Sequence, residues 1–459
     1  MKLIYDVGDR PKFGQLIVFA IQQLLAIMAA TLVVPVIINN TVGLQDGDAM
    51  STAAALFGAG AGTLVYVLFT KGKSPVFLGS SFAFLASMAA AFAGAVTVAV
   101  GYLGLIIGAI LAGLVYVVIA IAVKIAGVNW LNKLMPTVVI GPTVAIIGLS
   151  LAANAINDLK TANAGGNTLI AVLCGIVTLL VTMISSTYGK KTVRMIPFII
   201  GILAGYAVAA IFTLIGNAAG IEALMISDFS PFEGLAAGGI ALETFFEVPE
   251  FTFLTALGGF GDISLSYIGT IAVAYVPVAF VVFAEHVADH KNISSIIEKD
   301  LLEDPGLHRT LLGDGIGSMV GSFFGGCPNT TYGESVACVA ITRNASVATI
   351  IAAAVGAILI SFLSPFIAFV NSIPSCVMGG VCVALYGFIA VSGLKMVQKV
   401  DLNENRNLFV VSAILISGIG GLSLTFGKIT ITSIAAALIL GIIVNIVLSR
   451  KKTSEQDEE

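Results

Sequence analysis

The chain has 459 residues, of which 58% are hydrophobic and only 10% are charged, and its mean hydropathy is +1.04. Soluble domains carry about 25% charged residues, so this composition excludes a soluble enzyme and a nucleic-acid-binding protein. It predicts an all-α polytopic membrane protein in contact with lipid. The net charge of −4 excludes nothing further. The five cysteines are scattered and odd in number, which predicts no disulfide framework, metal site or cofactor.

Apolar runs predict fourteen membrane segments, because a helix needs about 20 apolar residues to cross a bilayer. The third, ninth and tenth segments are short or irregular. The fourteen cover roughly 13–37, 51–70, 74–98, 100–123, 136–154, 167–186, 196–215, 266–288, 310–325, 329–342, 345–369, 376–393, 407–425 and 430–449.

The basic residues predict the orientation, because Lys and Arg favour cytoplasmic loops. With these segments, 20 of the 22 Lys and Arg residues lie on one side, and only Lys160 and Lys428 lie on the other. We therefore expect a multi-pass protein of the cell membrane. Its N-terminus, 1–12, and its tail, 450–459, are both expected to be cytoplasmic. The first of these lacks the small-residue pattern of a cleavable signal peptide.

The order of the segments predicts an internal repeat. Seven segments precede an acidic extracytoplasmic connection, 217–265, and seven follow it. An odd number per half makes the second half enter the membrane from the opposite side. We therefore predict two inverted repeats, 13–216 and 266–449.

Two segments at matching positions of the halves are interrupted by polar and conformationally special residues. In the third segment the run is Ser74 to Phe82, with Pro75 and Gly79, and in the tenth it is Pro328 to Glu334. Neither run fits a continuous helix. Short extended breaks at that depth are tolerated only where they are buried or line a cavity, so the pair predicts a transport site at mid-membrane.

Ionisable residues beside these breaks indicate the chemistry of the site. Glu285, His286, Asp289 and His290 follow the apolar run of the eighth segment, and Glu334 ends the second break. Carboxylates at membrane depth are costly and by default mark an ion, proton or substrate path. Paired acceptors together with main-chain donors freed by the breaks suit a small, uncharged, planar solute with several N–H and C=O groups.

Three stretches carry a family resemblance: Ala284-Glu285-His286, Asp304 to Arg309, and Pro328-Asn329-Thr330-Thr331-Tyr332-Gly333-Glu334. They resemble the uracil permease branch of the nucleobase–ascorbate transporter family, over about 13–447. The resemblance implies a homodimeric symporter of uracil and protons that is not an enzyme. It also implies a core domain, 13–123 with 266–369, that moves against a gate domain, 136–215 with 376–449.

The resemblance implies roles for particular residues. Side chains matching Glu285 and Glu334 hydrogen-bond the pyrimidine, and main-chain N–H groups matching Phe82 and Gly333 donate to it. Ala30, Tyr332 and Tyr386 match apolar wall positions. The chain departs from the family at Gln22-Gln23 and at Ser335-Val336-Ala337, which affects fine specificity.

A third departure concerns the proton. Asp289 stands where the family has a histidine linked to proton coupling. It lies one helical turn from Glu285, so we expect the two carboxyls to share the coupling proton. The alternative is that Asp289 is a solvated helix end near Lys291. For His286, a packed structural histidine is favoured over a direct proton role.

Other functions remain open from sequence. One alternative is that the substrate is xanthine or another purine. Another is that the coupling ion is sodium. An anion exchanger of the same fold is disfavoured by Glu285 and Glu334. Sparse polar residues disfavour a channel. No catalytic set of residues is apparent, and no nucleotide-binding Gly-x-x-x-x-Gly-Lys loop occurs.

Overall fold

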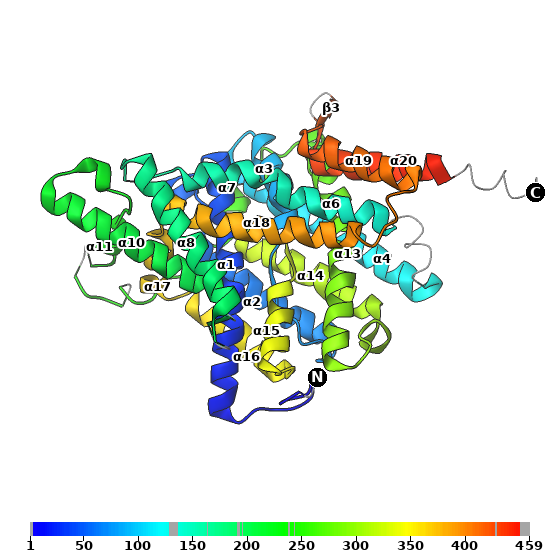
Figure 1. The fold of residues 1–459 in the computed structure, drawn as a ribbon, viewed down its shortest axis with the longest axis horizontal. Coiled ribbons are helices and arrows are strands. Elements are labelled where there is room, and N and C mark those ends of the chain that lie inside the picture. The colour runs from blue at the N-terminus through cyan, green and yellow to red at the C-terminus, as the bar shows by residue number, and fades with distance from the viewer. Residues whose placement is uncertain are drawn as a thin grey trace, which may run out of the picture.

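The computed structural model describes residues 3–127, 136–162, 164–190, 193–194, 196–236, 239–242, 244–426 and 429–449. Of the basic residues used for orientation, Lys2, Lys133, Lys191, Lys428 and those at 450–452 lie outside the described residues, as does the predicted tail 450–459. The described chain is mostly helical, with a few very short strands (Figure 1). The predicted helical class is therefore confirmed.

Within these ranges, eight helices are long and apolar enough to cross a membrane. They are α1 (Phe13–Val42), α2 (Thr52–Phe69), α4 (Val98–Ala126), α6 followed by α7 (Thr137–Ser150 and Ala152–Leu159), α8 (Thr168–Tyr188), α10 (Pro197–Ala219), α13 (Leu265–Ile297) and α18 (Ser375–Val397).

The other predicted segments contain shorter or more polar helices. These are α3 (Leu85–Ala93), α14 (Leu307–Gly325), α15 (Gly333–Thr342), α16 (Val347–Ile360), α19 (Asn405–Ile419) and α20 (Ser433–Ser449). A helix thus occurs at each predicted segment, while the number of membrane crossings and the inverted repeat stay predictions.

The helices differ from the predicted segments at the eighth and at the eleventh segment. The eighth segment was expected to end at 288, but α13 continues to Ile297 because its acidic residues turn inward rather than ending the helix. The eleventh is predicted over roughly 345–369. It is divided into α16 and α17 (Ser364–Asn371), with Pro365 in the first turn of the second helix. Proline fits that position because its missing N–H is not needed there.

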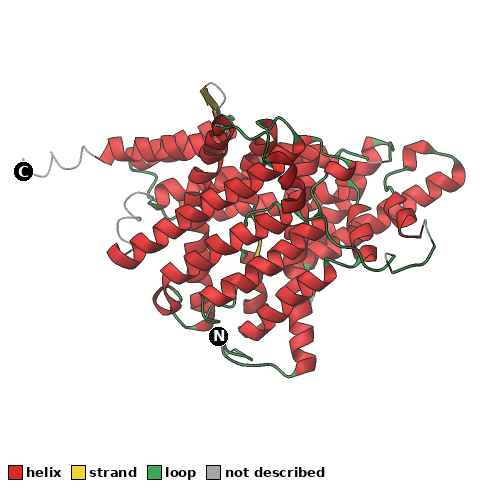
Figure 2. Cartoon of the chain, turned by 180° about the vertical axis from the view of Figure 1, so that it is seen from behind, coloured by secondary structure: helices red, strands yellow, loops and turns green. Residues whose placement is uncertain are grey.

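The two interrupted runs form paired strands. β1 (Leu78–Ser80) pairs antiparallel with β2 (Asn329–Thr331), and Gly79 lies opposite Thr330. Figure 2 shows a short strand enclosed by helices near the centre of the molecule. The extended breaks expected in the third and tenth segments are therefore present. Their mutual pairing supplies partners for buried backbone groups that water cannot reach.

Close helix packing through glycine supports this pair. α14 packs along α2. A Cβ atom added to Gly62 would lie 2.6 Å from the Gly317 carbonyl oxygen and 2.7 Å from Nδ2 of Asn329. That same Nδ2 atom donates to the Gly58 carbonyl at 3.0 Å. The absence of side chains at these glycines therefore lets β2 lie against α2.

We predict that Gly62→Ala destabilises the protein, because the added methyl group must push apart backbone atoms of two helices. Overpacking of this kind costs about 1–3 kcal/mol. The measurement is the midpoint of thermal unfolding in detergent. Gly387→Ala on α18 is the matched control, since nothing lies within 4 Å of its added Cβ. Equal midpoints for the two variants would contradict the close approach of α2 and α14.

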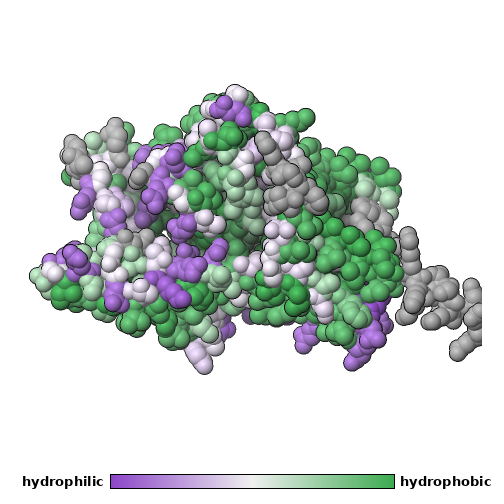
Figure 3. Space-filling view, turned by 90° about the horizontal axis from the view of Figure 1, so that it is seen from above, coloured by the Kyte–Doolittle hydropathy of each residue, from purple (hydrophilic) through white to green (hydrophobic). Residues whose placement is uncertain are grey.

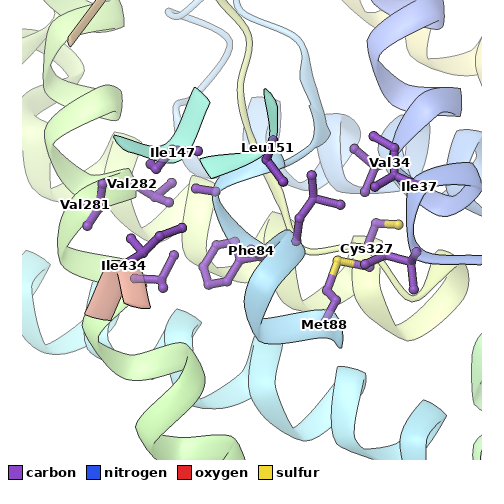
Figure 4. Packing of buried hydrophobic residues seen from close by; sticks show 14 of the residues in the cluster. Val34, Ile37, Phe84, Met88, Ile147, Leu151, Val281, Val282, Cys327 and Ile434 are labelled. Atoms are coloured by element: carbon purple, nitrogen blue, oxygen red, sulfur yellow. The ribbon is translucent and has the colours of Figure 1, made fainter. Parts of the chain in front are cut away.

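Buried apolar side chains join helices from both predicted domains. In Figure 4 residues of α1, of α3 and the residue before it, and of α13 lie close to residues of α6 and α20; the labelled ones include Val34, Ile37, Phe84, Met88, Val281, Ile147 and Ile434. At the end of α1 the Asn40 amide also donates to Asp158 of α7 at 3.5 Å. The predicted core and gate segments are thus in contact here.

The outer surface carries many exposed large hydrophobic side chains. In Figure 3 hydrophobic residues cover most of the right-hand part of the face, and hydrophilic residues gather on its left-hand part. Broad exposed apolar surface of this kind marks contact with lipid or protein, which agrees with a membrane protein.

The connection between the two halves packs on the helices that follow it. It contains α11 (Ser230–Ala236), at the left end of Figure 1, and α12 (Thr252–Ala256). Phe253 stacks on Phe323 of α14 with ring centroids 4.7 Å apart, and the Glu247 amide donates to the Phe362 carbonyl at 2.9 Å. The part of the connection around α12 therefore caps the helices.

A further short hairpin, β3 (Leu424–Phe426) paired with β4 (Ile429–Ile431), follows α19, in the region where the thirteenth segment was expected to continue to 425.

Candidate functional site

A cavity of about 540 Å³ lies beside the paired strands. Three acidic side chains line it, Glu285 and Asp289 from α13 and Glu334 from α15. Most other lining residues are apolar, and they come from both halves of the chain; they include Ala26, Phe82, Val144, Ile147, Phe198, Tyr332, Gly333, Leu385, Phe388 and Ile389. Sites for small molecules have this size range, about 300–1,000 Å³, and combine apolar walls with a few polar groups.

Helix α13 places its two carboxyls on one side. Glu285 and Asp289 are four residues apart, so they project from the same face of the helix. Asp289 Oδ2 accepts a hydrogen bond of 2.8 Å from Oγ1 of Thr331. The helix continues for two more turns beyond Asp289. The alternative of a solvated helix end near Lys291 is therefore wrong.

The crossing strands position the other side of the site. Tyr332 follows β2, and its hydroxyl donates to the Ser80 carbonyl of β1 at 2.7 Å, while its amide donates to the Phe77 carbonyl at 3.2 Å. The Ser81 amide donates to the Pro328 carbonyl at 2.8 Å. These bonds hold the starts of α3 and α15 next to each other at the cavity.

Two of the cavity-lining residues, Phe82 and Gly333, stand where helical segments begin. Among the residues that the structure describes, the amides of Phe82 and Gly333 donate to no protein acceptor, and both residues line the cavity. The first turns of a helix leave N–H groups unsatisfied. Residues with unpaired backbone amides and the carboxyls of Glu285 and Glu334 therefore line the same cavity, and their roles toward a ligand stay a prediction.

His286 points away from the cavity into a buried polar network. Its Nδ1 lies 2.7 Å from Oδ2 of Asp314 on α14, and its Nε2 lies 3.0 Å from Oγ1 of Thr310. His286 and Asp314 are fully buried, and His286 does not line the cavity. This position is that of a packed structural histidine, and the proton role considered for it has no direct contact with the cavity.

His290 extends the same network. Its Nε2 lies 2.6 Å from the hydroxyl of Tyr66 on α2, which in turn lies 2.7 Å from the hydroxyl of Ser74. Its Nδ1 lies 2.8 Å from the His286 carbonyl. One face of α13 thus bonds α2 and α14, and this contact fixes the rotation of the face that carries Glu285 and Asp289.

Two residues expected as apolar walls lie behind the lining. Ala30 is 1% exposed and packs in the cluster around α1 and α16. Tyr386 is 2% exposed, and its ring lies edge-on to the ring of Phe82 with centroids 6.0 Å apart. Neither lines the cavity in this conformation, whereas Phe82, Glu285, Tyr332, Gly333 and Glu334 all do.

Sequence reasoning missed a contact between two of the family departures. The Gln23 side-chain amide donates to the Ser335 hydroxyl, which also accepts a hydrogen bond of 2.9 Å from the Phe77 amide. This bond joins α1, the first break and α15 directly behind Glu334. Both residues were noted as departures from the family pattern, but no local signal showed that they pair.

Arg194 is another lining residue that sequence reasoning assigned only to orientation. It donates to the Thr187 carbonyl at 2.8 Å and lines the cavity together with Ser186, Ser392 and Met396. The cavity thus extends from the three carboxyls to the end of α8. Within the described residues, no three or more His, Cys, Asp or Glu side chains are placed to share a metal ion.

Comparison with known proteins shows the family of the chain. The model of a family described as "Permease family" matches residues 14–427. The uracil permease of Bacillus caldolyticus is 38% identical over 97% of this chain and 95% of its own length. The uracil permease of Bacillus subtilis (strain 168) is 37% identical over 99% of this chain and 98% of its own length. That of Escherichia coli (strain K12) is 36% identical over 95% of this chain and 92% of its own length.

Solved structures share the fold at much lower identity. The transmembrane domain of the cyanobacterial bicarbonate transporter BicA has a TM-score of 0.60 at 14% identity, covering 96% of this chain and all of that one. The murine anion transporter Slc26a9 in its inward-facing state has a TM-score of 0.61 at 12% identity. The match covers 97% of this chain and 70% of that one. The chain therefore belongs to the permease family, as a multi-pass membrane transport protein related to the bacterial uracil permeases.

Proposed function

We propose that the chain is a secondary active transporter that imports uracil together with protons. The observation that carries this proposal is one cavity in which carboxyls and unpaired main-chain amides face the same space, in a chain related to uracil permeases. Binding residues would be Glu285, Glu334, Phe82, Gly333 and Tyr332. Ala30 and Tyr386 would support the wall from behind.

The chemistry of uracil suits these groups. Its flat ring carries two N–H donors and two C=O acceptors on its edges. Carboxylates of Glu285 and Glu334 can accept from the N–H groups, and the amides of Phe82 and Gly333 can donate to the C=O groups. An analogue that lacks one of these edges leaves a buried polar group unpaired, which is a strong basis for rejection. The same carboxylates disfavour an anionic substrate.

For coupling, we propose that Glu285 and Asp289 share one proton. The two groups line the same cavity one helical turn apart, and close carboxyls titrate as a pair rather than singly. A proton on this pair removes charge from the cavity, where an unpaired carboxylate is costly. Uracil and proton would then enter the closed state together.

For transport, we propose alternating access between the core segments, 13–123 with 266–369, and the gate segments, 136–215 with 376–449. The acids and free amides belong to the core, and the opposite wall, with Ile147, Phe198 and Phe388, belongs to the gate. The cavity reaches Arg194, on the side predicted to be cytoplasmic, so we infer an inward-facing state. We further propose a homodimer in the cell membrane, with both termini cytoplasmic.

The test is uptake of radiolabelled uracil by proteoliposomes with and without a pH gradient, in competition with other nucleobases. We expect a protonophore to abolish the uptake. Unlabelled uracil should compete with the labelled uracil, whereas xanthine and other purines should leave the uptake unchanged. Purine preference would overturn the proposed substrate. Uptake that follows a sodium gradient and ignores the protonophore would overturn the proposed coupling ion.

A further inference from the structure

The carboxyl group of Asp289 is hydrogen-bonded to the second break and lies near Gly333. Oδ2 accepts from the Thr331 hydroxyl at 2.8 Å. Oδ1 is the nearest atom to an added Cβ at Gly333, at 3.9 Å. Thr331 is buried in β2, whereas Asp289 is only partly buried because it also faces the cavity. Asp289 therefore contacts the cavity on one side and the substrate-facing backbone on the other.

Thr331 is well placed to pass a change at Asp289 to the binding groups. Its backbone is paired with Leu78 in the strand ladder, and it precedes by two residues the Gly333 amide that donates to no protein acceptor within the described chain. Glu334 follows immediately in the first turn of α15. A shift of the Thr331 side chain thus acts on a short segment that carries a proposed donor and a proposed acceptor.

The surroundings of Asp289 contain few other charges. The titratable groups that face it from the packed elements are acidic or phenolic: Glu285 on α13, Glu334 on α15, Asp314 on α14 and Tyr66 on α2. His290 is next to it in sequence but bonds Tyr66 on another face of α13. Among the described lining residues, Arg194 is the basic one. Against these neighbours, the Thr331 hydroxyl is the group that donates a hydrogen bond to the Asp289 carboxyl.

We propose that Thr331 transmits the protonation of Asp289 to the Gly333–Glu334 segment and so makes uracil affinity depend on the proton. This inference rests on the proposed function. An ionised carboxylate only accepts hydrogen bonds, whereas a protonated carboxyl also carries a donor. The bond from Thr331 is charge-assisted only in the ionised state, and such bonds are about twice as strong as neutral ones. Protonation of Asp289 therefore weakens the bond from Thr331, so the position of the Thr331 side chain in β2 depends on the proton.

The test compares uracil affinity of the purified protein at about pH 5.5 and about pH 8 by binding of radiolabelled uracil. For the parent protein we expect affinity about tenfold higher at the lower pH. Thr331→Val, which keeps the shape and removes the hydroxyl, should reduce that ratio to within about twofold. Thr331→Ser should restore it. Thr331→Ala serves as a second hydroxyl-free variant should the valine protein fail to fold.

Thr182→Val on α8 is the matched control, because its buried hydroxyl donates to the Thr178 carbonyl of its own helix at 2.8 Å and bonds no other element among the described residues. It should keep the parent ratio. Hydroxyl-free variants that retain the tenfold ratio would overturn the inference and leave the proposed function intact. Folded variants that bind no uracil at either pH would make Thr331 a binding residue and also overturn it. A parent protein whose uracil affinity does not depend on pH would overturn the inference. A parent protein that binds no uracil would refute the proposed function itself.

Discussion

Replacement of Glu285 by Gln, or of Glu334 by Gln, is expected to reduce uracil uptake at least tenfold, and the double replacement to abolish it. Each carboxylate is proposed to accept an N–H group of the ring inside a largely apolar cavity. Hydrogen bonds to charged groups contribute about 1.5–3 kcal/mol, and each 1.4 kcal/mol is about tenfold in affinity. The amide keeps the size of the side chain but presents N–H where an acceptor is needed.

The measurement is the initial rate of radiolabelled uracil uptake in proteoliposomes at matched protein content. Glu404→Gln is a suitable control, because Glu404 lies at the exposed start of α19, outside the cavity. It should transport at the parent rate. If the double variant accumulates uracil at the parent level, the two carboxyls do not bind uracil, and the central claim of the proposal is wrong.

The parts of this site that sequence predicts are those with a local physical cost. An acidic side chain such as Glu334, in a run with proline and glycine, is expensive within a membrane unless it serves a function. That cost, with the matching positions of the two breaks in the halves of the chain, predicts that the breaks and the acids lie together. The same breaks predict free amides at Phe82 and Gly333, which the structure leaves without a protein acceptor among the described residues. The family resemblance added their role toward the pyrimidine.

The parts that sequence did not predict depend on contacts between distant segments. The bond from Gln23 to Ser335 joins residues 312 positions apart, and that from Thr331 to Asp289 spans 42. No local pattern encodes such a pairing. The end of α13 was hard to predict for a related reason. The polar residues Asp289 and His290 are typical of a helix end, but in the fold their hydrogen-bond partners come from β2 and α2.

The fold by itself does not choose the substrate. Bicarbonate and anion transporters share it with this chain at 14% identity or less, so function must be argued from the residues in the cavity. Three carboxyls near the crossing strands, with Arg194 at the far end of the lining, suit a neutral solute that travels with a cation. They do not suit an anion bound at the starts of α3 and α15.

Asp289→Asn is expected to separate transport from the proton. The amide can still occupy the space of the carboxyl and accept from the Thr331 hydroxyl, so α13 and β2 should stay in contact. It cannot gain or lose a proton near neutral pH. Uracil exchange across the membrane should therefore continue, while accumulation driven by a pH gradient should fall to the level seen without a gradient.

Two assays in the same proteoliposomes distinguish these results: counterflow of radiolabelled uracil, and net uptake with an imposed pH gradient. Asp262→Asn provides the control, since Asp262 is exposed in the connection before α13 and does not line the cavity. It should behave as the parent in both assays. Proton-driven accumulation that survives in Asp289→Asn would exclude Asp289 as a carrier and leave Glu285 as the site where the proton and uracil meet.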